Sequence, residues 1–204
     1  AGQSGNVLFL IEKPVAALMD ERFIIRSFSP METMGGCVVL DPDPTQKRKT
    51  LRLWTENLSK EPSKRFHQFV SEFWKTPQSL GNWSRQFHAH ESHVKLWLKS
   101  LKIRNEKGLI FTDESVEKSS SLIREILTKF HDENPYKKSL SKDRIQASTS
   151  FNGNWLSFIL ENMKNEFSIS LLHQYGKWEI PGLLTELLII RITSHINTPF
   201  HIFF

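Results

Sequence analysis

Short apolar runs alternate with turn-forming residues through the first 44 positions, and no helical spacing joins them. Residues 7–11, 23–25 and 38–40 are rich in β-branched and aromatic side chains, which predicts three antiparallel strands. The pair Gly35-Gly36 allows a tight bend or a close backbone approach. Three strands are too few to close a barrel, so we expect meander or partial-barrel material with exposed edges.

After Pro44 the apolar spacing becomes helical, with apolar side chains recurring every three or four residues. We expect Ser63 to cap the second helix, and Thr112-Asp113 to cap the last one. Two short strands, near Ile103 and over 109–111, are separated by a turn. This order of helices and hairpin is that of a winged-helix module. Helices are predicted over 51–58, 66–74, 79–87 and 90–101, and a further one runs from the Thr112-Asp113 cap to a stop at Asn134-Pro135.

A second module repeats this order at low sequence similarity. Helices are predicted over 141–147 and 155–163, and strands over 167–172 and 178–180. A further helix is expected over 183–196. The predicted fold class is therefore α+β, with a partial β-barrel followed by tandem winged-helix domains.

The 204 residues carry a formal net charge of +5 and a pI near 9.3, which favours a nucleic-acid partner. A single cysteine, Cys37, excludes an intramolecular disulfide framework and fits a reducing cytosol. Its apolar strand predicts a buried, inert thiol. No signal peptide is visible, and charged residues interrupt the apolar stretch 183–204, so no membrane span is expected.

Two basic groups are candidate phosphate contacts, and the alternative for each is a solvated helix face or linker. The helix 90–101 carries only Lys95 and Lys99, without an Arg or Asn/Gln pair suited to base edges, which weakens sequence-specific DNA reading. The candidate nucleic-acid-binding residues are Lys47, Arg48, Lys49 and Arg52 in the first group, and Lys137, Lys138, Lys142 and Arg144 in the second.

Candidate chemistry is sparse. His88, His90 and His93 could approach a zinc ion, but no further ligand at matching spacing completes a site, so no metal site is predicted. The sequence has no phosphate-binding G-x-x-x-x-G-K-[ST] loop and no G-x-S-x-G nucleophile turn, so neither catalytic nor cofactor-binding residues are assigned. The six tryptophans sit mostly at core spacing, which favours packing over base stacking, with Trp83 the least determined.

Several phrases of the chain can be compared with known families: F-L-I-E-K-P-V-A-A-L (9–18), R-F-I-I-R-S-F-S-P (22–30), M-G-G-C-V-V-L-D-P (34–42), F-H-D-E-N-P-Y (130–136), L-S-K-D (140–143) and W-E-I-P-G (178–182). Together they resemble the bacterial type of selenocysteine-specific translation elongation factor. One departure from the family is Gly35-Gly36-Cys37, where three glycines are usual. The chain lacks an initial Met and opens just before a strand, so we expect a fragment that starts inside a domain.

The resemblance implies a cytoplasmic parent GTPase that delivers selenocysteinyl-tRNA to the ribosome at recoded stop codons. This chain would be an RNA-binding spacer without catalysis. GTP and Mg would belong to a separate GTPase domain, and the selenocysteine-insertion mRNA hairpin to a later repeat. The implied domains are a partial barrel (1–44), a winged helix with its linker helix (45–134), a second winged helix (135–182) and the start of a third (183–204).

Two readings from other classes remain open. A winged-helix DNA-binding transcriptional regulator would show an Arg/Lys-rich recognition helix and a dimer interface. A histidine-metal hydrolase would need ordered zinc at His88, His90 and His93.

We predict that residues 1–42 are the least stable part of the isolated chain, because their sheet edges lack partners. Amide hydrogen exchange should be faster there than in the helices of 46–112. Equal protection of the two regions would contradict this expectation.

Overall fold

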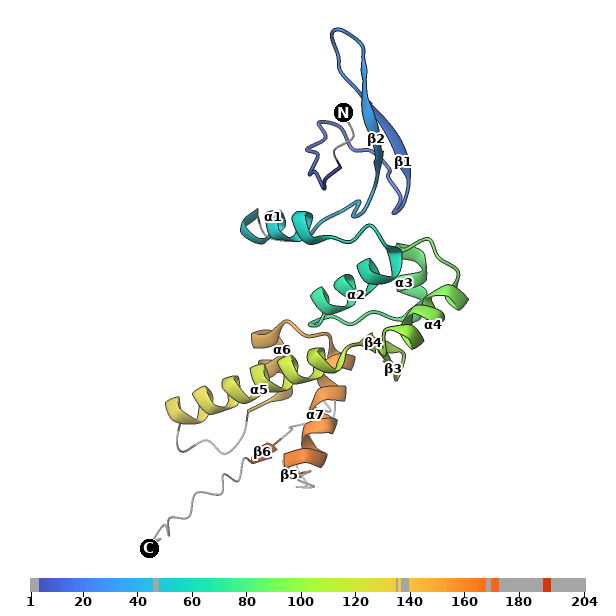
Figure 1. Ribbon diagram of the computed structural model, residues 1–204. Coiled ribbons are helices and arrows are strands. Elements are labelled where there is room, and N and C mark those ends of the chain that lie inside the picture. Colours follow the sequence, from blue (N-terminus) through green and yellow to red (C-terminus); the bar gives the residue numbers. More distant parts are fainter. Residues whose placement is uncertain are drawn as a thin grey trace, which may run out of the picture. The chain divides into compact units, whose positions relative to one another are not determined.

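The computed structural model describes residues 4–45, 48–134, 136, 140–167, 170–172 and 189–191, and its class is α+β, as predicted (Figure 1). Its described strands form three separate two-stranded antiparallel sheets, and these residues close no barrel. The chain divides into two compact units, residues 1–73 with 77–113, and 74–76 with 114–204. In the described part of the chain, no helix combines the length and the apolar character that crossing a bilayer requires.

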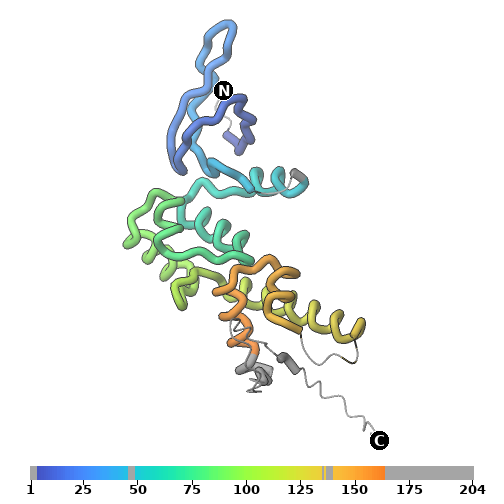
Figure 2. Tube along the Cα trace, turned by 180° about the vertical axis from the view of Figure 1, so that it is seen from behind, coloured from blue at the N-terminus to red at the C-terminus, as the bar shows by residue number. Residues whose placement is uncertain are grey.

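The first unit begins with a β-hairpin and continues with four helices and a second, shorter hairpin. The described residues of the second unit form three helices and a short pair of strands, and the trace in Figure 2 follows these helices. The elements of the first unit are β1 (Arg22–Arg26), β2 (Thr33–Val38), α1 (Arg48–Asn57), α2 (Pro62–Glu72), α3 (Leu80–Gln86), α4 (Glu91–Ser100), β3 (Arg104–Glu106) and β4 (Leu109–Phe111). Those that follow are α5 (Asp113–Glu133), α6 (Lys142–Thr149), α7 (Gly153–Phe167), β5 (Ser170–Leu172) and β6 (Ile189–Arg191).

Strands β1 and β2 pair with each other, and Phe23 lies opposite Cys37. The register of this pairing shifts between Ile25 and Arg26. The strand expected over 7–11 is wrong: this run is exposed and pairs with no described strand. An apolar run becomes a strand only when a neighbouring strand takes its hydrogen bonds, and its sequence cannot report that.

The third expected strand also lies elsewhere, since β2 begins at Thr33 and contains both glycines of the pair Gly35-Gly36. A Cβ added at either glycine would meet nothing within 4 Å, so the expected bend or close approach is absent. Cys37 is half-exposed and not buried, because a two-stranded ribbon covers only part of its own faces.

Helices α2, α3 and α4 enclose an aromatic core with Phe66 near its centre. The Phe66 ring lies 5.6 Å from Trp83 and 5.4 Å from Phe87, both edge-on, a favoured geometry for aromatic pairs. Trp83 is fully buried, which confirms packing over base stacking for this residue. Helix α2 begins at Pro62 with Glu61 as its N-cap, so the expected Ser63 cap is wrong: proline takes the first helical position, where its missing N–H matters least.

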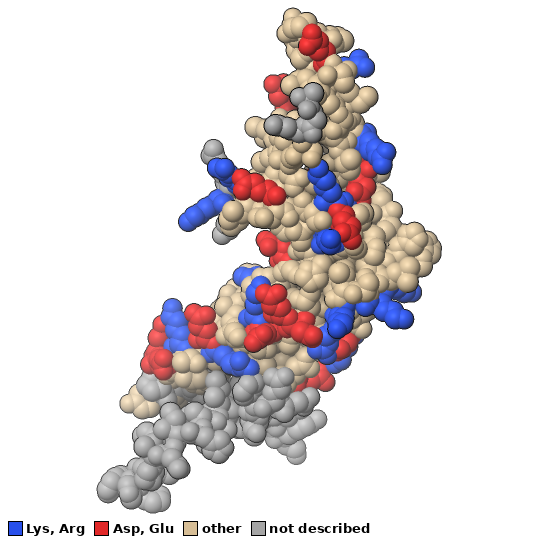
Figure 3. Space-filling model, in the orientation of Figure 1, with Lys and Arg blue, Asp and Glu red and all other residues tan. Residues whose placement is uncertain are grey.

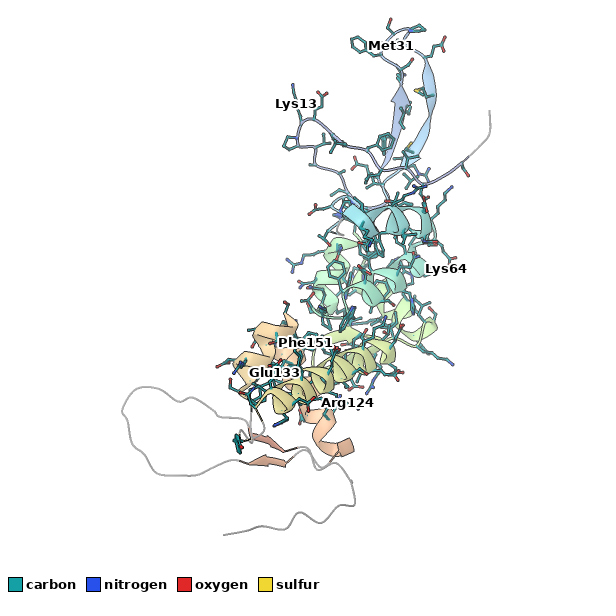
Figure 4. All side chains as sticks on the ribbon, turned by 90° about the vertical axis from the view of Figure 1, so that its left-hand side faces the viewer. Lys13, Met31, Lys64, Arg124, Glu133 and Phe151 are labelled. Atoms are coloured by element: carbon teal, nitrogen blue, oxygen red, sulfur yellow. The ribbon has the colours of Figure 1, made fainter. Side chains whose placement is uncertain are left out.

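Three contacts join the N-terminal β segment to α1 and α2. Asn6 donates to the backbone carbonyls of Thr55 and Leu58, at 2.9 and 2.8 Å. Met19 is 3% exposed and belongs to the aromatic core, while the Trp54 indole N–H donates to Asp41 at 2.9 Å. The segment is thus held at the base of its hairpin, and Met31 lies at the far tip (Figure 4).

A fourth connection, the ion pair between Asp20 and Arg65, joins the same segment to α2. The Arg65 side chain is completely buried, and its guanidinium donates to both carboxylate oxygens of Asp20 at 2.5 and 2.6 Å. It also donates to the carbonyls of Ser59 and Lys60, at 3.1 and 3.0 Å. A buried guanidinium needs such acceptors, because an uncompensated charge in a protein interior is strongly unfavourable.

In the second unit, α5, α6 and α7 lie side by side (Figures 1 and 2). Helix α5 is 21 residues long and buries Ser119, Ile123, Leu127 and Phe130 at helical spacing. The Trp155 indole N–H donates to Ser119 Oγ at 3.1 Å, so a buried polar pair joins α5 to α7.

Strand β5 lies within the run 167–172 that the sequence predicted as a strand, but its partner is β6, with Ser170 opposite Arg191. The expected partner, 178–180, lies outside the described residues. The helix expected over 183–196 is wrong at 189–191, which form a strand. Its β-branched Ile189 and Ile190 favour extended backbone once a partner strand is present.

Substituting Asp20→Asn should destabilise the chain by roughly 1–3 kcal/mol, because it leaves the buried Arg65 charge without its counterion. Asp20 is partly exposed, which keeps the expected loss below that of a fully buried pair. Urea unfolding should show a lower midpoint with an unchanged slope. The matched control is Glu32→Gln, an exposed hairpin carboxylate; an equal loss in both variants would contradict the assigned role of the ion pair.

Burial raises the pKa of Asp41, and the hydrogen bond from Trp54 only partly offsets it. A folded-state pKa above the unfolded value makes proton uptake stabilising. This contribution is full below about pH 4 and is lost as the pH rises through the folded pKa. Asp41→Asn keeps an acceptor for Trp54 without the charge, so its advantage in unfolding free energy over the parent should grow with pH and then level off. A difference independent of pH would contradict this assignment.

Candidate nucleic-acid interface

The first predicted basic group lies at the start of α1. Lys49 and Arg52 are exposed, and Arg52 Nε donates to Glu56 Oε1 at 2.8 Å, one turn further along the helix. This hydrogen bond raises the pKa of Arg52 and partly neutralises its charge locally. Lys47 and the Arg48 side chain lie outside the described part of the chain. Within this group, Lys49 is thus the described cation with no ion partner.

The second predicted group lies in the first turn of α6, where both described members contact their own unit. Lys142 Nζ donates to Ser157 Oγ at 2.8 Å, and the Arg144 guanidinium lies over the Phe130 ring, 5.3 Å from its centroid. Lys137 and Lys138 lie outside the described residues. A phosphate would have to compete with these packing contacts for Lys142 and Arg144.

The three histidines near α4 are exposed. The His90 ring is the N-cap of α4, and its Nδ1 accepts a hydrogen bond from the Ser92 N–H at 3.3 Å. Throughout the described ranges, no three or more His, Cys, Asp or Glu side chains are grouped to hold a metal ion. The position of His90 is therefore accounted for by helix capping.

Two open hollows lie on the first unit, of about 340 and 600 Å³. The smaller lies between residues 6–8 and α1, and the larger runs along residues 9–13 and β1. Neither lining brings a nucleophile together with a histidine base, so neither has the arrangement that acyl transfer uses.

Sequence reasoning gave little weight to a third basic surface. Figure 3 shows Lys and Arg side chains gathered over α4 and the β3–β4 hairpin. The signal was present in the chain, since residues 92–105 contain three lysines and one arginine but no Asp or Glu. It was missed because the cations lie on two elements, and only the fold shows that they belong to one unit.

No protein-family model matches this chain, and no curated protein does either. Fold and surface on their own define an α+β protein of two units with basic helical surfaces. The likeness to the elongation factors therefore stands on the quoted phrases, and the function derived from it is a proposal.

Proposed function

We propose that this chain is a segment of a bacterial-type selenocysteine-specific translation elongation factor, and that it positions RNA without catalysing a reaction. Its N-terminal β segment would be part of a barrel that meets the acceptor region of selenocysteine tRNA. The helical units would be winged-helix modules that separate this barrel from a distal grip on the mRNA hairpin. GTP hydrolysis would belong to another domain of the parent protein.

The observation that carries this proposal is the apolar surface of the β segment. Among the described residues, thirteen of the sixteen exposed large hydrophobic side chains lie within residues 7–38, and Leu10 and Phe28 are each 99% exposed. Water-exposed apolar surface of this extent is rare on a folded domain and marks a face that packs against something else. A partial barrel packed against its remaining strands would have this property.

The helical part supports the proposal through its element order. Helices α2, α3 and α4 followed by the β3–β4 hairpin have the order of a winged-helix module, and α6 and α7 followed by β5 begin a similar order. Between them in sequence lies α5, whose 21 residues extend about 30 Å and pack within the second unit.

A winged-helix transcriptional regulator is the second candidate, because the same element order serves DNA binding. The lysines on the outer face of α4 favour it, whereas the lack of Arg, Asn or Gln on that face disfavours base reading.

The test is binding of the full chain, across a salt series, to selenocysteine tRNA, an ordinary elongator tRNA, a selenocysteine-insertion mRNA hairpin and random duplex DNA. We expect the selenocysteine tRNA to bind about tenfold more tightly than the elongator tRNA, with little preference for the hairpin. The elongator tRNA is the matched control, since it carries the same backbone chemistry.

Tight, sequence-selective binding to duplex DNA would replace this proposal with the regulator. Equal binding to all four nucleic acids, lost in moderate salt, would remove the specific tRNA role and leave only general phosphate attraction.

A further inference from the structure

Helix α4 has two distinct faces. Val94 and Leu98 are buried in the aromatic core, and Trp97 packs against its edge. The opposite face is exposed, with Lys95 and Lys99 one turn apart and Lys102 just beyond the helix end. Lys95 and Lys99 are four residues apart on one helix, so their side chains lie on the same face of α4, and Lys102 follows at its C-terminal end.

This row of cations is poorly neutralised. Lys95 lies 3.9 Å from Glu91, a long contact between two exposed side chains. Lys99 and Lys102 form no ion pair within the described residues. Arg104 behaves differently, since it pairs with Glu106 at 2.6 Å and with Asp113 at 3.2 Å. The row is thus the part of this basic surface that can meet an external anion.

Two lysines occupy backbone positions that favour glycine or asparagine. Lys102 follows Leu101, the C-cap of α4, with φ at 54°, and the Ile103 N–H donates to the Leu98 carbonyl at 2.9 Å. This is a Schellman motif, whose left-handed residue is usually glycine. Lys107 has φ at 50° and precedes Gly108 in the two-residue β3–β4 turn, where Asn-Gly is preferred.

The backbone conformation at these two positions does not favour lysine. A left-handed conformation is unfavourable for a side chain with a Cβ, and lysine has no short polar group to offset the strain locally. Lys99 differs, because a cation in the last turn interacts favourably with the helix dipole. Strained residues of this kind gather at functional sites, where their side chains are needed.

We propose that Lys95, Lys99, Lys102 and Lys107 form one surface that binds the phosphate backbone of a nucleic-acid duplex. The row on α4 would follow one strand, and Lys107 at the turn would reach a neighbouring phosphate. This site differs from both basic groups picked out in the sequence. This inference deepens the proposed function. It rests on that function in one respect, the choice of RNA as the natural source of the phosphates.

The chemistry of the surface favours backbone contact over base reading. Lysine ammonium groups bind phosphates as point charges, whereas base edges are read by arginine, asparagine or glutamine. Leu96, the apolar member of this face, is 63% exposed and provides no hydrogen bond. Binding should therefore depend strongly on salt and hardly on sequence.

The experiment compares the full chain with a Lys95→Gln/Lys99→Gln/Lys102→Gln variant. The probes are an RNA duplex of about 20 base pairs and arbitrary sequence, the corresponding DNA duplex, and poly-glutamate. The control variant is Lys13→Gln/Lys60→Gln/Lys64→Gln, which removes equal charge from exposed positions elsewhere in the same unit. We expect the first variant to bind RNA at least about tenfold more weakly, and to lose about one unit of salt slope per lysine.

Single substitutions separate binding from folding. Lys102→Gly and Lys107→Asn should each raise Tm by a few degrees, because they relieve left-handed strain, and yet each should weaken duplex binding. A purely structural role for these lysines would move stability without moving binding. Undiminished RNA binding in the triple variant, or equal losses in the control, would overturn the proposal.

The probes also identify the source of the anion. Weaker binding to RNA and DNA duplexes alike supports phosphate recognition, and a larger loss with RNA supports the proposed role. Poly-glutamate binding that exceeds duplex binding and depends on the same lysines would indicate an acidic protein as the partner. That result would contradict the proposal that these lysines bind a nucleic-acid duplex. If the triple variant still discriminates selenocysteine tRNA but binds duplex RNA like the parent, this inference fails while the proposed function stands. If the parent chain does not discriminate selenocysteine tRNA but the triple variant loses duplex binding, the proposed function fails while this inference stands.

Discussion

A buried arginine organises the first unit. The Arg65 side chain projects from α2 and is completely buried, so its guanidinium must find acceptors within the protein. Two of these acceptors are backbone carbonyls just before α2. The third is the carboxylate of Asp20, which lies two residues before β1. The pair joins segments 45 positions apart in the chain. Because a buried cation without its counterion is strongly unfavourable, this contact fixes where the β segment meets the helices.

This arrangement holds the β hairpin by its base and leaves the rest of it unsupported. Met19 enters the aromatic core beside the ion pair, and Asp41 accepts from Trp54 where the chain leaves β2. Beyond these points β1 and β2 pair with no further described strand, Phe9 packs edge-on against Phe23 at 6.0 Å between ring centroids, and most of the apolar side chains face solvent. A two-stranded ribbon is marginal by itself, so further packing against this face would provide the stability that it lacks. That physical need is what supports a partial barrel.

The basic side chains of this chain differ in how available they are to bind an external anion. Lys142 and Arg144 contact a hydroxyl and an aromatic ring, and Arg52 shares its charge with a neighbouring carboxylate. The lysines of α4 lie on a face without such partners nearby, apart from the long contact of Lys95. Counting basic residues along a sequence weights all of them equally. The fold separates the basic residues that already have partners from those that can bind an anion, because this availability depends on the local partners of each side chain.

Local patterns were sufficient for most of the helices. Apolar spacing predicted helices at 79–87, where α3 lies, and 90–101, where α4 lies, and the hairpin at 103–111 followed from its turn residues. The N-cap of α2 was missed, because a proline at the first helical position outweighed a serine one residue later. Among the site residues, the basic groups were found by composition, whereas Lys102 and Lys107 were not, since their left-handed backbone is invisible in a linear pattern.

The sequence by itself determined the α+β class, the helical periodicities and the basic balance of the chain, because these depend on neighbours three or four positions apart. Only the tertiary structure decided that residues 7–11 pair with no described strand, that 189–191 form a strand, and that Arg65 is buried against Asp20. Each of these depends on a partner far along the chain. A strand needs another strand, and a buried charge needs a counterion, and the sequence does not say which distant segment will provide them.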